Sequence, residues 1–334
     1  MNRSGSGFRF GFGSSLRLLF AAGLVLLAAT DARAVRRTED PLALVPADAA
    51  TVAVMKWSEL RQTPLGARVF RDLDHISGDD DAARFLEETG LTPREDIDTI
   101  ILAMTPGAKG SKDSGMVMFE GRFDPARIAK ALDSRKATLR NSPAGEYWVL
   151  KERGDEPGAV AIVNRGFIIC GSEATVVATL ARRESGGDGG LTSGQGIGKY
   201  LSRIDRDASA WALVDVTRFP GARREDSSDG EPSHALFSAM KSVSMVALEA
   251  TVKSDGIAFA ATGLTADAES RDLLEDALRG MLAMWRLAMQ EKSPELVSVI
   301  RRFQIDNDSD GVSIRGMLPS GFLESLAAKR QAAR

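Results

Sequence analysis

The sequence is poor in the two residue types that most often mark catalytic or metal-binding motifs. Its 334 residues include one cysteine, Cys170, and two histidines, His75 and His234. A single cysteine excludes an intrachain disulfide, and a chain of this length buries enough surface to fold without one. Because neither a His-Glu-x-x-His nor a Gly-x-Ser-x-Gly pattern occurs, zinc and serine–histidine chemistry lack their usual residues. We therefore predict no catalytic, cofactor-binding or metal-binding residues.

Long hydrophobic runs are also missing, apart from one near the start of the chain. Arg3, Arg9 and Arg17 precede an uncharged apolar run over 18–29, which is followed by a small-x-small tripeptide at 32–34. This order is typical of a secretory signal peptide. Twelve residues in a helix cover about 18 Å, less than the roughly 30 Å of a hydrocarbon core. We predict a signal peptide over 1–34 and a periplasmic or extracellular location. The alternative is a leader retained as an anchor.

The charge balance gives little reason to expect a nucleic acid or an anionic membrane as partner. Residues 1–34 carry four arginines and one aspartate, a net charge of +3, so their removal changes the net charge from −3 to −6. A mildly acidic chain has no electrostatic attraction to phosphate-rich surfaces. The hydrophobic fraction of 43% is ordinary for a globular protein and argues against wholesale disorder.

One sequence pattern occurs twice and divides the chain after the leader. Residues 48–60 read DAATVAVMKWSEL and residues 207–219 read DASAWALVDVTRF, an offset of 207 − 48 = 159 residues. Each stretch begins with small residues and continues with an apolar run typical of a mostly buried strand. A Ser or Thr and then a large apolar residue follow the run. We interpret the pair as a trace of internal duplication. It predicts a first unit over 35–184, a Gly/Ser-rich linker over 185–198 and a second unit over 199–334.

The order of strand and helix signals predicts an α+β fold. Apolar runs predict strands over 51–55, 97–104, 115–120, 146–151, 159–163, 167–170, 211–216, 243–252, 256–264, 303–305 and 312–318. Asp124-Pro125, Ser172 and Asp267 are typical helix starts, because their oxygens can cap free backbone N–H groups. Short connections favour antiparallel pairing. We predict two tandem similar units, each a mainly antiparallel sheet with helices on one face.

Four short features suggest chemistry or binding but fit it poorly. The acidic stretch 306–311 resembles the start of a calcium loop, yet its twelfth position is Met317 rather than glutamate, so we interpret it as a hairpin turn and leave calcium open. The stretch 194–199 resembles a phosphate loop but lacks the preceding strand and the hydroxyl residue. Cys170 lies in an apolar strand, which favours a core role over that of a nucleophile. The tripeptide 153–155 resembles an adhesion motif, but a match this short is best attributed to chance.

A long helix predicted over 267–290 carries a stripe rich in methionine. Met281, Met284, Trp285 and Met289 continue the apolar face of Leu274 and Leu278. Methionine fills ordinary cores and also occurs on adaptable binding surfaces. We interpret the stripe as core packing with the sheet. The alternative is that this end of the helix extends past its sheet and forms a groove for a partner or an apolar ligand.

The residues that lead into the first predicted strand resemble a stretch found in other proteins. The stretch from Leu44 to Val52, followed by a strand and later by a second such unit, resembles bacterial exported proteins of unknown function with tandem α+β repeats. The resemblance implies export and repeated units but no activity. We therefore expect a non-enzymatic binding or structural protein of the cell envelope. The alternative is a carrier of an apolar ligand beside the 267–290 helix. The sequence identifies neither the partner nor the oligomeric state.

Overall fold

The structure is a computed structural model that describes residues 40–61, 63, 80–107, 112–150, 157–219, 241–290, 294–309, 311–323 and 325. The predicted signal peptide, both histidines and the tripeptide at 153–155 lie outside these residues. Within the described ranges, no helix is both long enough and apolar enough to cross a bilayer.

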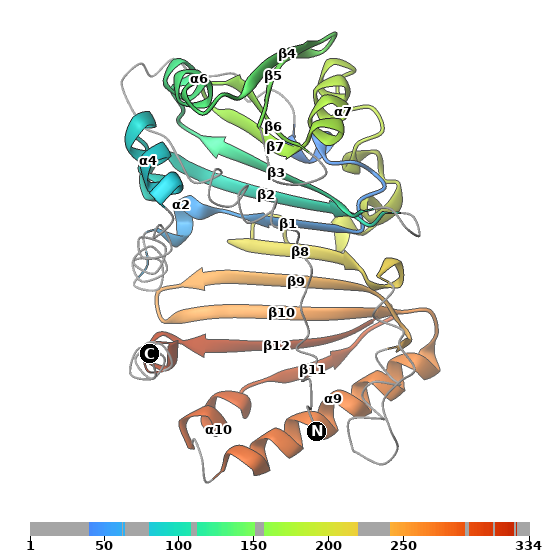
Figure 1. Cartoon of the computed structure of the whole chain (residues 1–334). Coiled ribbons are helices and arrows are strands. Elements are labelled where there is room, and N and C mark those ends of the chain that lie inside the picture. The colour runs from blue at the N-terminus through green and yellow to red at the C-terminus, as the bar shows by residue number, and fades with distance from the viewer. Residues whose placement is uncertain are drawn as a thin grey trace, which may run out of the picture.

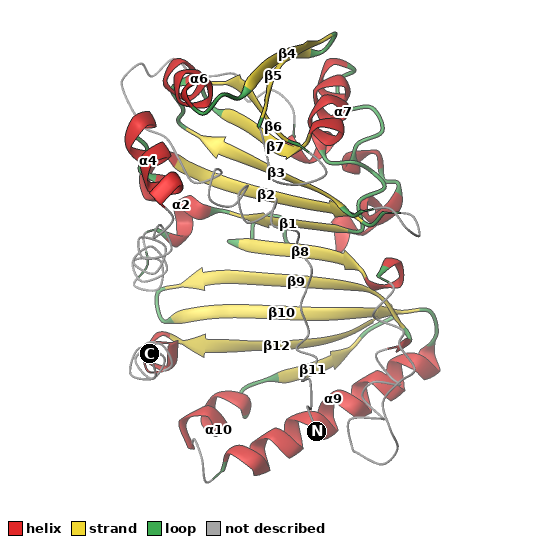
Figure 2. Ribbon diagram, viewed as in Figure 1, coloured by secondary structure: helices red, strands yellow, loops and turns green. Residues whose placement is uncertain are grey.

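Twelve strands form one open antiparallel sheet (Figures 1 and 2). They are β1 (Thr51–Met55), β2 (Ile97–Thr105), β3 (Ser114–Gly121), β4 (Thr138–Ser142), β5 (Gly145–Val149), β6 (Gly158–Asn164), β7 (Phe167–Ser172), β8 (Ala210–Asp215), β9 (Val243–Lys253), β10 (Gly256–Thr265), β11 (Gln304–Asn307) and β12 (Gly311–Pro319). Their spatial order is β11-β12-β10-β9-β8-β1-β2-β3-β7-β6-β5-β4. The predicted α+β class with antiparallel pairing is confirmed.

Helices occupy the connections and the sheet ends (Figure 2). The α-helices are α2 (Trp57–Leu60), α4 (Asp80–Thr89), α5 (Pro93–Asp96), α6 (Pro125–Ser134), α7 (Glu173–Glu184), α9 (Ala268–Met289) and α10 (Pro294–Ile300). Short 3-10 helices are η1 (Pro41–Leu44), η2 (Leu191–Ser193), η3 (Gly196–Arg203) and η4 (Val216–Arg218).

The prediction of two separate sheets is wrong, because the two repeated sequence stretches pair with each other. β1 and β8 lie side by side at the centre of the sheet, with Val54 opposite Trp211 and Ala53 opposite Ala212. The backbone carbonyl of Asp207 accepts a hydrogen bond from Lys56, and that of Asp48 accepts one from Arg218. Each strand therefore pairs with backbone N–H and C=O groups that the other would otherwise expose at a sheet edge.

The prediction that helices cover only one face is also wrong for the first half of the sheet. On β3, Met116 and Met118 pack in one cluster with residues of α7, whereas Val117 and Phe119 pack in another with residues of α4 and α6. Successive side chains of a strand point to opposite faces. The unbroken apolar run of β3 therefore reflects burial on both faces of the sheet, as expected for a central strand with helices packed on each face.

The predicted helix starts are confirmed at the atomic level. The Asp124 carboxylate accepts hydrogen bonds from the backbone N–H groups of Ala126 and Arg127. The Ser172 hydroxyl accepts one from the Thr175 N–H, and the Asp267 carboxylate accepts one from the Ser270 N–H. These side chains occupy donors that the first helical turn leaves free.

The Gly/Ser-rich segment 185–198 contacts the rest of the fold at several positions. Leu191 and Ile197 are buried in the main core, and Gly190 forms a β-bridge with Pro46. A Cβ on Gly190 would lie 1.8 Å from the Ala43 carbonyl oxygen, and one on Gly198 would lie 2.0 Å from that of Leu191. Glycine is therefore required here for close backbone approach, not for flexibility. The division of the chain into domains stays a prediction.

Candidate functional site

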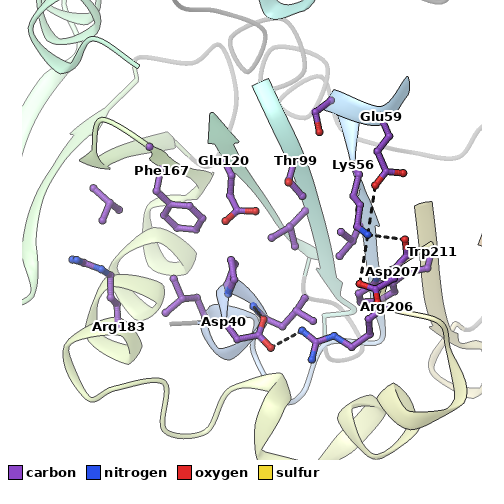
Figure 3. Close-up of a pocket in the computed structure, with 18 of the residues that line it drawn as sticks. Asp40, Lys56, Glu59, Thr99, Glu120, Phe167, Arg183, Arg206, Asp207 and Trp211 are labelled. Carbon is purple, nitrogen blue, oxygen red and sulfur yellow. Dashed lines mark hydrogen bonds and ion pairs between the residues drawn. The ribbon is translucent and has the colours of Figure 1, made fainter. Parts of the chain in front are cut away.

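A cavity of about 990 Å³ opens beside the central strands in the first half of the sheet. Strands β1, β2, β3, β7 and β8 supply one side, and η1, α7 and the segment before β8 supply the other (Figure 3). Its size matches the range of about 300–1,000 Å³ that is typical of small-molecule sites. The cavity is therefore the first place to look for a ligand.

The floor of the cavity is apolar and firmly packed. Trp211, Ile101 and Leu42 are buried in the main core and reach the cavity with one edge. Phe167 adds a half-buried aromatic ring. The Arg182 guanidinium donates a hydrogen bond to the Leu44 carbonyl at 2.9 Å, which ties α7 to η1. Burial lowers the pKa of Arg182. The floor is thus held in place before any ligand arrives.

Lys56 lies at one end of the cavity within a group of polar side chains. Its Nζ donates to the Asp207 carbonyl at 2.7 Å and lies 3.7 Å from the Glu59 carboxylate. The second Glu59 oxygen accepts a hydrogen bond from the Ser209 hydroxyl at 2.6 Å. Ser209 in turn accepts one from the backbone N–H of Val252. This network fixes the end of the cavity to both halves of the sheet.

Further charged residues line the remaining walls. Arg206 pairs with Asp40 at 2.5 Å. Glu120 and Thr99 are cross-strand neighbours on β3 and β2 and project from the sheet side by side (Figure 3). Arg183 lines the cavity from the last turn of α7. The site therefore combines an apolar floor with charges of both signs, an arrangement suited to orienting a ligand.

The polar side chains that line the cavity are carboxylates, hydroxyls, an amide and cations. Across the described ranges of the chain, no three His, Cys, Asp or Glu side chains gather closely enough to hold a metal ion. Cys170 lies on β7 in the second core cluster, and burial raises its pKa to about 12, so the thiol stays protonated.

A second surface of interest is the exposed side of α9. Leu274 and Leu282 are buried, and α9 packs on β10, β11 and β12 at one end of the sheet (Figure 1). On the same helix Leu273, Met284, Trp285 and Leu287 are exposed by 57%, 44%, 50% and 72%. Leu287 is five residues beyond Leu282, or about 140° around the helix axis. The expectation that the methionine-rich stripe is core is therefore wrong for Met284 and Trp285, which lie on the exposed side.

The motifs that the sequence singled out lie away from the cavity. The acidic stretch 306–311 connects β11 and β12, as expected of a hairpin turn. Its side chains are used locally, since Asp308 accepts a hydrogen bond from the Gly311 N–H and Asn307 donates to Asp272 and Glu275 on α9. In 194–199, Ile197 is buried and Lys199 lies over the Tyr200 ring. A Cβ on Gly196 would meet the Ala47 carbonyl at 2.1 Å.

Sequence reasoning missed the cavity altogether. Its lining residues range from Asp40 to Trp211 and come from strands, two α-helices, one 3-10 helix and turns. Only the duplication pattern gave an indirect signal, because Lys56 and Asp207 belong to its two copies and meet across the β1–β8 pair. No spacing rule along the chain predicts this meeting.

Comparisons with known proteins give a weak structural likeness and no family. No protein-family model matches the chain, and no curated protein matches it in sequence. Among solved structures, crystal form III of the Treponema protein TP0453 is similar with a TM-score of 0.47 and 10% identity, covering 88% of this chain and 100% of that one. Crystal forms I and IV of the same protein have TM-scores of 0.44, 11% identity and coverage of 88% and 98%. The chain thus resembles TP0453 in outline, at low identity.

Proposed function

We propose that the chain is an exported binding protein of the cell envelope and not an enzyme. The leader pattern motivates the location. The binding role rests on the exposed apolar side chains of α9, of which Leu287 is 72% exposed. Large contiguous apolar patches are rare on soluble monomers and typically mark interaction sites. Export is tested by sequencing the N-terminus of the protein from a periplasmic or culture fraction. We expect Val35 as the first residue, and an intact Met1 contradicts cleavage.

The binding role is tested by comparing envelope proteins captured by wild-type and variant protein. Met284→Ser combined with Leu287→Ser removes apolar surface from α9, so a partner of this surface should be lost. Because both side chains are exposed, the free energy of unfolding should change by less than about 0.5 kcal/mol. Leu139→Ser is the matched control, since Leu139 is 46% exposed on β4 at the other end of the sheet. Equal capture by both variants counts against the proposal.

A second candidate function is that of a carrier for an apolar ligand on the same side of α9. Leu248 on β9 is a further exposed apolar side chain in the second half of the sheet. Native mass spectrometry of the purified protein should then show bound lipid. Trp285 provides a local reporter because it is half exposed, whereas Trp57 and Trp211 are buried. A bound acyl chain should shift its emission to shorter wavelength, and Trp285→Phe should remove that shift.

We infer in addition that the two halves arose by copying one unit. The strands on either side of the β1–β8 pair run in the orders β1-β2-β3-β7 and β8-β9-β10-β12. Ala53 faces Ala212 in that pair, and the two residues are 159 positions apart, the offset of the repeated sequence. The pair is therefore centred on equivalent positions. An experimental structure in which 40–184 does not superpose on 199–323 strand for strand removes this support.

A further inference from the structure

We propose that α9 pairs antiparallel with the α9 helix of a second copy of this chain, along a row of apolar residues on its exposed side. This row, the exposed stripe, consists of Leu273, Ala277, Gly280, Met284 and Leu287. The inference rests on the proposed function, because it names a partner for the same surface of α9.

The exposed stripe has the spacing of a helix–helix contact. Its members are four, three, four and three residues apart, which is the heptad spacing that keeps one side of a helix against another helix. The stripe lies about 140° around the helix axis from the side that carries Leu274 and Leu282. Packing of α9 on its own sheet therefore does not account for this second apolar series.

The stripe is open along most of its length. Leu273, Met284 and Leu287 are all exposed, and a Cβ on Gly280 would meet no atom within 4 Å. Ala277 lies at the border of the buried side and packs against the core cluster of Leu274. Because α9 lies at one end of the sheet, a second copy can approach it there (Figure 1).

The order of large and small residues fits a second copy that runs in the opposite direction. When Gly280 lies opposite Met284 of the second copy, Ala277 lies opposite its Leu287, and the two-fold axis repeats both contacts. Each large side chain then meets a small residue, and Gly280 lets the two backbones approach closely. In a parallel pair Gly280 would face Gly280 and leave a gap. The stripe is therefore self-complementary in the antiparallel arrangement, as a two-fold interface requires.

The charges of α9 are compatible with this arrangement. Glu275 and Arg279 form an ion pair at 2.5 Å on another side of the helix. Asp276 borders the stripe and would lie opposite Ala288 of the second copy. The two Asp276 carboxylates would be about 18 Å apart along the helix axis. Their mutual repulsion across that distance is weak and screened by salt.

The size of the stripe predicts a weak dimer. From Leu273 to Leu287 it spans about 21 Å, and a strip one helix wide, about 10 Å, covers far less than the roughly 800 Å² per partner of a standard stable interface. We expect the chain to be monomeric at low micromolar concentration. Stability measurements made there report on the monomer, in which Leu287 is exposed.

Sedimentation equilibrium of the purified protein tests the pairing. We expect a monomer at about 2 μM and a large dimer fraction at about 500 μM, as for a small interface. Leu287→Asp should weaken association at least about tenfold, because its charge would lie against Ala277 of the second copy. Leu139→Asp is the matched control, since Leu139 is an exposed leucine on β4. A monomer at both concentrations, or equal weakening by both variants, overturns the proposal.

Disulfide formation tests the antiparallel register. Gly280→Cys and Met284→Cys are mixed at high concentration under mild oxidation, and mass spectrometry identifies the cross-linked products. Cys170 is buried and stays out of the reaction. We expect the mixed disulfide to exceed both self-disulfides, because a disulfide needs Cα atoms within about 4.4–6.8 Å of each other. Predominant self-disulfides would mean a parallel pair and contradict the assignment.

The results also separate this inference from the proposed function. A chain that stays monomeric but captures an envelope partner through Met284 and Leu287 overturns the pairing and leaves the binding role standing. A monomer that carries bound lipid at α9 overturns the pairing in favour of the carrier. A dimer that is weakened by Leu287→Asp supports the pairing, whether or not any envelope partner is captured.

Discussion

Asp96 is a buried carboxyl with an unusual titration. Only 2% of the residue is exposed, and one carboxylate oxygen accepts a hydrogen bond from the Thr92 N–H at 3.0 Å. Burial raises the pKa of Asp96 to about 6, against the opposing effects of that hydrogen bond and of the Arg122 charge. The folded protein therefore favours the protonated carboxyl more than the unfolded chain does.

This titration predicts a pH dependence of stability. Because the folded pKa lies above the unfolded value of 3.8, the stabilising contribution is complete below about pH 4 and is lost as pH rises through 6. Asp96→Asn should keep an acceptor for Thr92 and remove this part of the dependence. Urea unfolding at pH 4.5 and 7.5 measures it, with the exposed Asp133→Asn as control. An unchanged difference between the two pH values in Asp96→Asn contradicts the prediction.

Replacement of glycine by alanine should have opposite effects on stability at Gly121 and at Gly280. A Cβ at Gly121 would lie 1.9 Å from the Asp96 carbonyl oxygen, whereas one at Gly280 on α9 would meet no atom within 4 Å. Gly280→Ala should therefore raise the free energy of unfolding by about 0.5–1 kcal/mol through helix propensity. Gly121→Ala should lower it, because a central strand would have to shift. Denaturant midpoints measure both, and a destabilising Gly280→Ala shows that this side of α9 is covered.

At the scale of the element, α9 shows how far an apolar pattern determines burial. The spacing of its apolar residues predicts a helix with one apolar side. The structure has this helix from Ala268 to Met289. The helix lies over the end of the sheet, so that only part of the apolar side meets β10, β11 and β12. Leu274 joins a cluster with Val243 and Val312, while Leu287 faces outward. The sequence contains no signal that separates these leucines.

The two kinds of leucine should differ in their contribution to stability. Leu282→Ala removes a side chain that is 3% exposed, so we expect a loss of about 2–5 kcal/mol in the free energy of unfolding. Leu287→Ala should cost less than about 0.5 kcal/mol. Chemical denaturation of both variants measures the difference. Similar losses would show that Leu287 is buried in solution, for example against a second copy of the chain.

The short strand β4 was not predicted, and the reason is local. Thr138, Leu139, Arg140 and Asn141 are all exposed, and the strand ends the sheet, pairing only with β5. Without burial there is no apolar alternation to read. The longer strands and the helix caps were predicted because each depends on residues within a few positions of one another.

For the whole molecule, the central pair β1–β8 joins what the sequence presents as two units. The main core crosses this pair, with Val52, Val54 and Ile101 on one side and Trp211 and Leu213 on the other. Polar contacts also cross it, including the hydrogen bond from Ser209 to Glu59. The halves therefore share the main core as well as strand pairing.

Separated halves should fold poorly and recover when mixed. Residues 35–184 and 199–334, expressed apart, would each expose an unpaired central strand and part of the shared core. We expect cooperative thermal unfolding of the mixture and none of either fragment, measured by circular dichroism. Cooperative unfolding of one fragment alone would show that it is an independent domain, as the domain boundaries from sequence predicted.

The sequence by itself determined the local structure: which runs form strands, and which Asp or Ser begins a helix. These choices depend on chemistry within one or two turns of chain, as at Asp124 and Ser172. Only the tertiary structure decided that β1 pairs with β8, that Lys56 meets Asp207 beside a cavity, and that one side of α9 stays uncovered. The first two outcomes depend on contacts between residues more than a hundred positions apart, and the third depends on where separate elements pack around α9. The periodicity of a single element carries no information about such contacts.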